Sequence, residues 1–160
     1  LGRSARGVNS MKLRSADTII GCDIVPRNYD ADLLVVTSDG FGKRTKLSEF
    51  RSQNRGGIGL IATKFKSNMS RLVALTIVEE KDEIMLVTSS GIVTRIKAGD
   101  ISCQGRPATG VRAQNLMEND TVVSVNKIVN TDKDDDDYDS AVDASTQEVE
   151  AQGEQTSLIE

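Results

Sequence analysis

Pairs of basic residues recur at a fixed spacing along this chain. Arg44 and Lys46 stand two residues apart, and Arg95 and Lys97 repeat the pair 51 residues later. Because side chains two residues apart on a β-strand share a face, each pair should lie on one face of its strand. A row of such cations suits the phosphates of a DNA duplex, which it would hold through the backbone without reading the bases.

The residues around these pairs repeat as well. LLVVTSDGFGKRTKLSEF at 33–50 aligns without a gap with IMLVTSSGIVTRIKAGDI at 84–101, and residues 2–20 match 105–123 as a partial third copy. Each full copy has an apolar run, a turn at Asp39-Gly40 or Ser90-Gly91, a second strand and a glycine-rich loop. This period predicts an all-β, propeller-like array, with two blades plus half of a third over residues 1–130.

Strand alternation predicts which side chains point outward. In the second copy Val93, Arg95 and Lys97 should share the outer face, and in the first copy Arg44 and Lys46 should do the same. The recurrence favours a phosphate-binding row. The alternative is that these cations simply solvate the outer side of a strand, where Lys and Arg usually lie.

The loop RSQNRGGIGL at 51–60 has glycines that allow close backbone approach, and its amides suit a phosphate oxygen. A nucleotide-binding loop is excluded, because no Gly-Lys-Ser/Thr ending is present and no helix pattern follows. Two interpretations stay open and are compatible: a tight connection between blades, and DNA contact through Arg55 and the glycines.

Charge is segregated along the chain. Residues 1–130 hold 19 Lys/Arg and 13 Asp/Glu, a balance of +6, whereas residues 131–160 hold one Lys and 11 acids, a balance of −10. The second segment has few large apolar residues, so we expect a disordered acidic tail.

Other functional classes find little support in the residues. The chain has no His, which excludes catalytic triads and His-based metal sites. Cys22 and Cys103 are far apart in sequence and have no metal-ligand spacing, so we expect two buried thiols. No apolar run has the length of a membrane helix, so we expect no membrane association and a cytoplasmic location. The first residue is Leu1 rather than Met, which suggests a fragment.

Several motifs in order resemble the C-terminal domain of bacterial DNA gyrase A: TSDGFGKRTKLSEF, QNRGGIG, EIMLVTSSGIVTRIK and GRPATGVRAQNL, followed by an acidic tail. That family folds as a β-pinwheel of four-stranded blades and wraps duplex DNA around its basic rim. The resemblance implies an incomplete β-pinwheel that is non-catalytic by itself and supports ATP-dependent negative supercoiling by the holoenzyme, an ATP-hydrolysing type II DNA topoisomerase.

The same resemblance implies the cofactors and partners. ATP and Mg2+ would be used through other regions and the partner subunit, so no cofactor is expected in this chain. The partners would be double-stranded DNA, the rest of gyrase A as a dimer, and gyrase B. Two alternatives remain: the similar C-terminal domain of topoisomerase IV, and a protein-binding β-propeller scaffold, whose apolar partner surface would be little affected by salt.

The family's hallmark is a seven-residue box, Gln-Arg-Arg-Gly-Gly-Lys-Gly. Its nearest match runs from Gln53 to Gly59, with Asn54 and Ile58 at two of the three basic positions, so it is a degenerate box. Together with the strand and loop cations, the predicted DNA-binding residues are Lys43, Arg44, Lys46, Gln53, Arg55, Gly56, Gly57, Gly59, Lys64, Lys66, Arg95, Lys97, Arg106 and Arg112.

The acidic tail should compete with DNA for the basic rim by charge alone, through residues 132–139. Truncation after Val129 is therefore expected to tighten binding to duplex DNA at low salt, and the difference should shrink as salt screens the charges. Titrations of both chains at several salt concentrations measure this. Equal affinities at low salt would leave the tail a solubilising role only.

Overall fold

The described part of the chain is built from short β-strands. The computed structural model describes residues 2–128, and among them only strands and two short 3-10 turns are regular. In chain order these are β1 (Asp32–Thr37), β2 (Phe41–Lys46), η1 (Leu47–Glu49), β3 (Leu72–Val78), β4 (Glu83–Thr88), β5 (Val93–Lys97), η2 (Ala98–Asp100), β6 (Val111–Arg112) and β7 (Val122–Ile128). The prediction of an all-β fold is confirmed. The acidic tail predicted over 131–160 lies outside the described residues.

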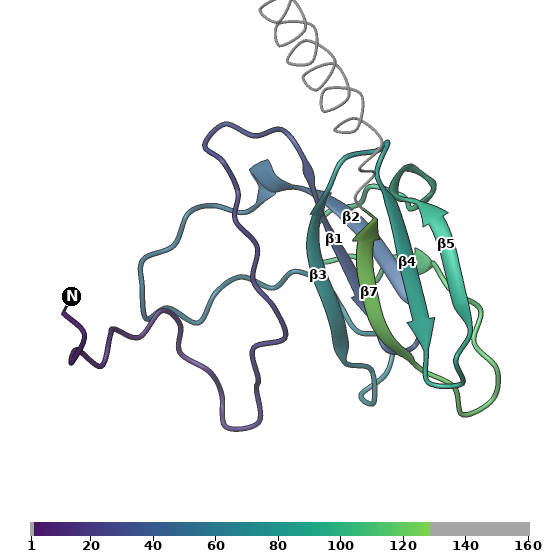
Figure 1. Cartoon of the computed structure of the whole chain (residues 1–160), viewed down its shortest axis with the longest axis horizontal. Helices are drawn as coiled ribbons and strands as arrows, with labels where there is room; N and C mark the ends of the chain where they lie inside the picture. The colour runs from purple at the N-terminus through teal and green to yellow at the C-terminus, as the bar shows by residue number, and fades with distance from the viewer. Residues whose placement is uncertain (1, 129–160) are drawn as a thin grey trace, which may run out of the picture. The chain divides into compact units, whose positions relative to one another are not determined.

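The strands form two antiparallel sheets (Figure 1). The first has the strand order β3-β1-β2-β6, and the second has the order β5-β4-β7. Each sheet contains a hairpin whose first strand pairs on its other side with a strand that follows a long loop. The predicted turns at Asp39-Gly40 and Ser90-Gly91 close the two hairpins.

The two units repeat in backbone detail. The pairing of β1 with β3 shifts register between Val36 and Thr37, and the pairing of β4 with β7 shifts between Val87 and Thr88. These positions are 51 residues apart, as are the 3-10 turns η1 and η2 that follow the hairpins. The sequence repeat therefore corresponds to a repeat of the local backbone geometry.

Apolar side chains of both sheets form one core. Leu34 and Val36 of β1 meet Ile84 and Leu86 of β4 in a cluster of buried side chains that also includes Val78, Ala98, Ile101 and Val122. Fully burying a side chain of this size contributes about 1.5–3 kcal/mol. Packing of the sheets against each other thus supplies much of the apolar burial.

The fourth strand of the first sheet comes from the second unit. β6 follows β5 in the chain but pairs with β2, with Phe41 opposite Arg112 and Gly42 opposite Val111. The second unit therefore covers the outer edge of the first hairpin. Within residues 2–128 no strand pairs with the outer edge of β5.

Burial follows this asymmetry. All six residues of β1 are buried, whereas β4 alternates between half-buried and buried positions. Four of the six residues of β2 are buried, and β5 alternates between exposed and half-buried positions. Equivalent strands of the two units thus lie in different environments.

The partial third copy keeps its turns but forms no long strand. Ala5 N donates to Gly2 O at 3.1 Å, as Ala108 N donates to Gly105 O at 3.1 Å, 103 residues later. Residues 19–25, which correspond to β7, are exposed and pair with no strand in the described structure. Cys22 lies in this segment.

Both cysteines are exposed, so the expectation of two buried thiols is wrong. Cys22 is in the open segment before β1, and Cys103 is in the chain that runs along the edge of β2. Neither position belongs to the packed faces of the sheets. Among residues 2–128 we find no helix with the length and apolar character needed to cross a bilayer.

The close approach of β6 to β2 predicts a difference between two equivalent glycines. Gly110 has φ +97°, and a Cβ there would lie 2.5 Å from Gly42 O, whereas Gly59 has φ +79° and only Met11 Cε, at 3.8 Å, near its Cβ position. We expect Gly59→Ala to cost about 1 kcal/mol of unfolding free energy through φ alone. Gly110→Ala should cost about 1–3 kcal/mol more through the clash. Denaturant unfolding of both variants measures the difference; equal losses would contradict the close approach.

Candidate nucleic-acid interface

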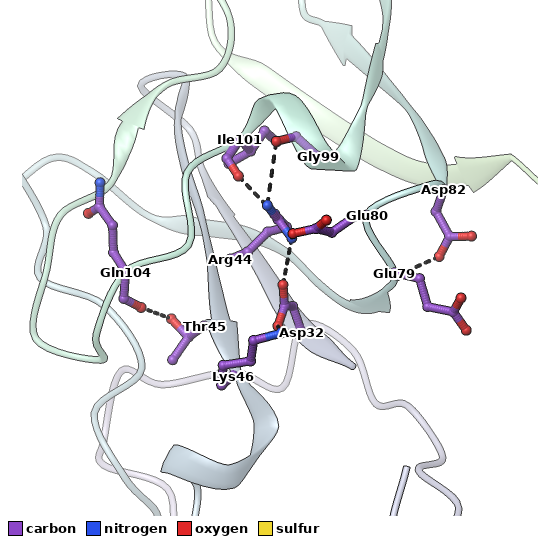
Figure 2. A network of polar contacts seen from close by, with 10 residues as sticks. All are labelled: Asp32, Arg44, Thr45, Lys46, Glu79, Glu80, Asp82, Gly99, Ile101 and Gln104. Carbon is purple, nitrogen blue, oxygen red and sulfur yellow. Dashed lines mark hydrogen bonds and ion pairs between the residues drawn. The ribbon is translucent and has the colours of Figure 1, made fainter. Parts of the chain in front are cut away.

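Arg44 lies at the centre of a buried polar network (Figure 2). Its Nη1 lies 2.6 Å from Asp32 Oδ2, and its Nε donates to Ile101 O at 2.8 Å. A second cation, Lys46 Nζ, lies 3.0 Å from the other carboxylate oxygen of Asp32. The Arg44 residue is 4% exposed. The guanidinium therefore holds the two units together.

The prediction that Arg44 lies on an outward row is wrong. The chain after η2 runs along β2, where Arg44 N donates to Ser102 O at 3.1 Å and Gln104 N donates to Arg44 O at 2.8 Å. Thr45 Oγ1 also donates to Gln104 O at 2.8 Å (Figure 2). Arg44 lies opposite Leu34, on the face of the hairpin that packs against the second unit, and its side chain donates to Ile101 O and Gly99 O there. Strand alternation correctly separates the two faces of β2 but does not show which face another unit covers.

Lys43 is also buried, although it was among the predicted phosphate contacts. Its ammonium group donates to Gly105 O at 2.7 Å and to Arg106 O at 2.5 Å, and the residue is 0% exposed. Burial lowers the pKa of Lys43, and the charge of Arg106 lowers it further, against the opposing charge of Glu49. Lys43 fixes the loop of the second unit and presents no free charge to a ligand.

The equivalent pair of the second unit lies in the open. Arg95 and Lys97 are exposed, and Val93 is exposed with them, so the predicted outer face of β5 is confirmed. Arg95 pairs with Glu83, and this contact raises the pKa of the guanidinium. Glu83 occupies the position of Asp32 in the repeat, so the same ion pair is buried in one unit and exposed in the other.

The degenerate box is an exposed, hollowed loop. Residues Arg51 to Gly57 line a hollow of about 340 Å³. Gly56 N donates to Ser10 O at 2.9 Å, and Lys12 N donates to Gly57 O at 2.8 Å, so the loop is held by the segment before β1. The Gln53 amide donates to main-chain oxygens within the loop itself. The Arg51 and Arg55 side chains are exposed.

Loops of the two units lie side by side next to β2. Thr63 Oγ1 and Lys64 N donate to Ala108 O at 3.2 and 3.3 Å. Arg106 is held by Glu49, whose Oε2 accepts from Arg106 N at 3.1 Å, and its guanidinium lies 5.9 Å from the centre of the Phe50 ring. These contacts bring cations of residues 64–66 and 106–112 to one region.

The structure sorts the predicted site residues by exposure. Exposed members are Lys46, Gln53, Arg55, Gly56, Lys64, Lys66, Arg95, Lys97 and Arg112; half-buried members are Gly57, Gly59 and Arg106; Lys43 and Arg44 are buried. Sequence reasoning missed Arg51, which lines the hollow. It also missed the acid that opens each hairpin, Asp32 and Glu83, although both recur at the 51-residue offset.

Acidic residues gather elsewhere. Residues 41–71 hold eight Lys/Arg and one acid, Glu49, whereas Glu79, Glu80, Asp82 and Glu83 crowd the corner between β3 and β4. At that corner Lys81 and Lys127 form ion pairs with Glu79 and Asp82, at 2.9 and 2.6 Å. Unneutralised positive charge is therefore concentrated at the loops beside β2. Among residues 2–128 no group of three or more His, Cys, Asp or Glu side chains is placed to hold a metal ion.

Comparisons with known proteins agree on one family. Over residues 1–26, 31–79 and 82–129 the chain matches the family described as "DNA gyrase C-terminal domain, beta-propeller". The A subunit of DNA gyrase from Synechocystis sp. is 40% identical over 155 residues, which cover 78% of this chain and 18% of that protein. The same protein from Staphylococcus aureus (strain MRSA252) is 36% identical, covering 94% of this chain and 17% of that protein. The chain thus spans less than a fifth of the length of these relatives.

Two solved structures are similar as well. The C-terminal domain of DNA topoisomerase IV matches with a TM-score of 0.70 and 30% identity, over 76% of this chain and 38% of that one. The DNA gyrase A C-terminal domain matches with a TM-score of 0.58 and 35% identity, over 62% of this chain and 34% of that one.

The two environments of the repeated ion pair predict unequal costs of removing it. Arg44→Met leaves the Asp32 carboxylate buried with only Lys46 beside it, so we expect the unfolding free energy to fall by about 3 kcal/mol or more. Arg95→Met, its matched control, breaks a solvent-exposed pair and should change the unfolding free energy little. Urea unfolding of both variants gives the two values. Similar losses would show that Arg44 is not buried as described.

Proposed function

Because this chain belongs to the DNA gyrase C-terminal domain family, we propose that it is a duplex-DNA-binding module of gyrase A. The observation that carries this proposal is the group of exposed cations on the loops beside β2, where Glu49 is the one acid of residues 41–71. Each phosphate that these cations neutralise releases counterions, which favours binding without selecting a sequence.

The cations are suited to a backbone contact for a structural reason. Arg51 and Arg55 project from a loop tied to residues 10–12, and Lys64 and Arg106 lie on loops tied to each other. Backbone hydrogen bonds therefore limit how far the charges can move apart, and less ordering is needed when a duplex binds. The contact would extend along the hairpins through Lys46, Arg95 and Lys97. Arg95 also forms an ion pair with Glu83, so it would contribute less to phosphate binding.

In the whole enzyme, this module would support negative supercoiling and leave the chemistry to other regions. DNA cleavage and ATP hydrolysis with Mg2+ would be carried out elsewhere in gyrase A and by gyrase B, with which the chain would assemble in the cytoplasm. The topoisomerase IV domain is the second candidate, favoured by its TM-score of 0.70. The gyrase assignment is supported by the gyrase A relatives at 36–40% identity.

A triple variant tests the proposed contact. Arg51→Ala, Arg55→Ala and Lys64→Ala together should weaken binding to a mixed-sequence duplex and reduce the slope of log K against log salt by about 0.9 for each phosphate that is no longer neutralised. The double variant Lys81→Ala and Lys127→Ala removes cations that already pair with acids, and it should change the slope little. Fluorescence anisotropy across a salt series measures both.

A protein-binding scaffold predicts the opposite pattern. Its partner surface would be apolar, so neither variant would alter the salt dependence of its binding, and nuclease treatment would leave its complexes intact. An unchanged slope in the triple variant, with wild-type affinity for the duplex, would contradict the DNA-binding proposal.

A further inference from the structure

The Phe41 ring holds two cations from different parts of the chain. Lys66 Nζ lies 4.5 Å from the ring centre and Arg112 Cζ lies 5.3 Å from it. Both distances are within the range in which a cation is attracted by the ring quadrupole. The two charged groups are therefore at most about 10 Å apart, although nothing in their sequence positions suggests that they meet.

Strand pairing and a loop bring the three side chains together. Phe41 begins β2 and Arg112 ends β6, and the two residues are direct cross-strand partners. Lys66 lies in the loop that precedes β3. Because β6 belongs to the second unit, the cluster exists only when that unit covers the edge of β2.

The two cations of the cluster form no ion pair in the described part of the chain. No carboxylate of residues 2–128 lies within ion-pair distance of Lys66 or Arg112. The nearby acid is Asp39, whose two oxygens accept hydrogen bonds from Thr37 Oγ1 at 2.5 Å and Ser70 Oγ at 2.7 Å. The charge of Lys66 helps to lower the pKa of Asp39, so this one carboxylate offsets part of the charge of two cations from beyond ion-pair distance. Two cations held close together, with one acid nearby and no ion pair, leave a net positive site suited to an anion.

The repeat shows that the fold itself does not require this cluster. At the 51-residue offset, Phe41 corresponds to Ile92 and Lys66 corresponds to Met117. The second unit builds the same hairpin with two apolar residues at these positions. The ring and its cations are therefore found in the first unit and are not needed to form the hairpin. Substitution of Ile92, the counterpart of Phe41, is a matched control for substitution of the ring.

We propose that Phe41 is a positioning residue, whose ring holds Lys66 and Arg112 as a paired binding site for phosphates of a DNA duplex. This inference rests on the proposed function and adds a residue that does not itself contact DNA. Duplex DNA carries one charge per about 1.7 Å of its axis, so two cations this close together face more than one phosphate. The ring limits the freedom of two long side chains that would otherwise have to be ordered on binding.

The test compares ring-containing and ring-less variants of the full 160-residue chain. Phe41→Leu should weaken binding to a mixed-sequence duplex by about two- to fivefold for each cation the ring holds, whereas Phe41→Tyr should bind as wild type. Ile92→Leu should have no effect. Thermal unfolding of each variant reports whether the fold is retained, and Phe41→Met serves as a second ring-less variant if Leu lowers the midpoint.

Coupling separates positioning from a merely structural role. Lys66→Ala with Arg112→Ala should weaken binding strongly in the wild-type background and much less in Phe41→Leu, because the ring-less chain has already lost the placement of both charges. If the losses of affinity from Phe41→Leu and from the Lys66→Ala, Arg112→Ala pair simply multiply, the inference is overturned. Unchanged binding by both ring-less variants would also overturn it. In either case the aliphatic parts of Lys66 and Arg112 would only cover the ring.

Two further arms separate the possible failures. If the wild-type chain does not bind the duplex at low salt, the proposed function fails, whereas wild-type binding that is insensitive to Phe41→Leu and Phe41→Met defeats only the role of the ring. Inorganic phosphate, matched in ionic strength by chloride, should compete equally weakly against wild type and Phe41→Leu. Binding of inorganic phosphate that is tighter to wild type than to Phe41→Leu, together with equal duplex affinities of the two chains, would assign the site to free phosphate and overturn the duplex assignment.

Discussion

The rest of the structure depends on one interaction, the covering of the outer edge of β2 by the second unit. Residues 102–104 and β6 bond to that edge and enclose the first hairpin. Of the strands in residues 2–128, none pairs with the outer edge of the second hairpin. An uncovered edge leaves a row of unpaired main-chain groups, and enclosure satisfies them. The Arg44–Asp32 pair lies within the first unit. The bond from Arg44 to Ile101 O, the Lys43 contacts and the Phe41 cluster form across this junction.

The sequence alone predicted the fold class and the hairpins well, because both follow from short-range patterns. The 51-residue period marks both turns, and alternation correctly places Arg95 and Lys97 on an outer face. The same reasoning failed at Lys43 and Arg44, because alternation describes an isolated strand and does not reveal what another unit will lay on it. Cys22 was misplaced for a related reason: its segment has an apolar, strand-like sequence but no strand beside it in the described structure.

Whether another unit covers a cation decides whether that cation is available to bind phosphate. Arg44 and Lys46 were the most attractive candidates for phosphate contact because they recur in register. The structure instead uses Arg44 to join the two units. Exposed charges lie on β5, at Arg95 and Lys97, and on the loops. The loop cations Arg51 and Lys66 have no basic counterpart in the repeat. A cation at a repeated strand position is therefore available for binding only where no other unit covers it, whereas the loop cations do not depend on the repeat.

The reactivity of individual lysines toward an amine-acetylating reagent, with and without duplex DNA, tests the central claim most directly. The account predicts that Lys43 is unreactive in both states, because its ammonium group is buried against main-chain oxygens. Lys64 and Lys66 should react freely and become protected by DNA, whereas Lys81 should react equally in both states. A reactive Lys43, or protection of Lys81 as strong as that of Lys64, would contradict it.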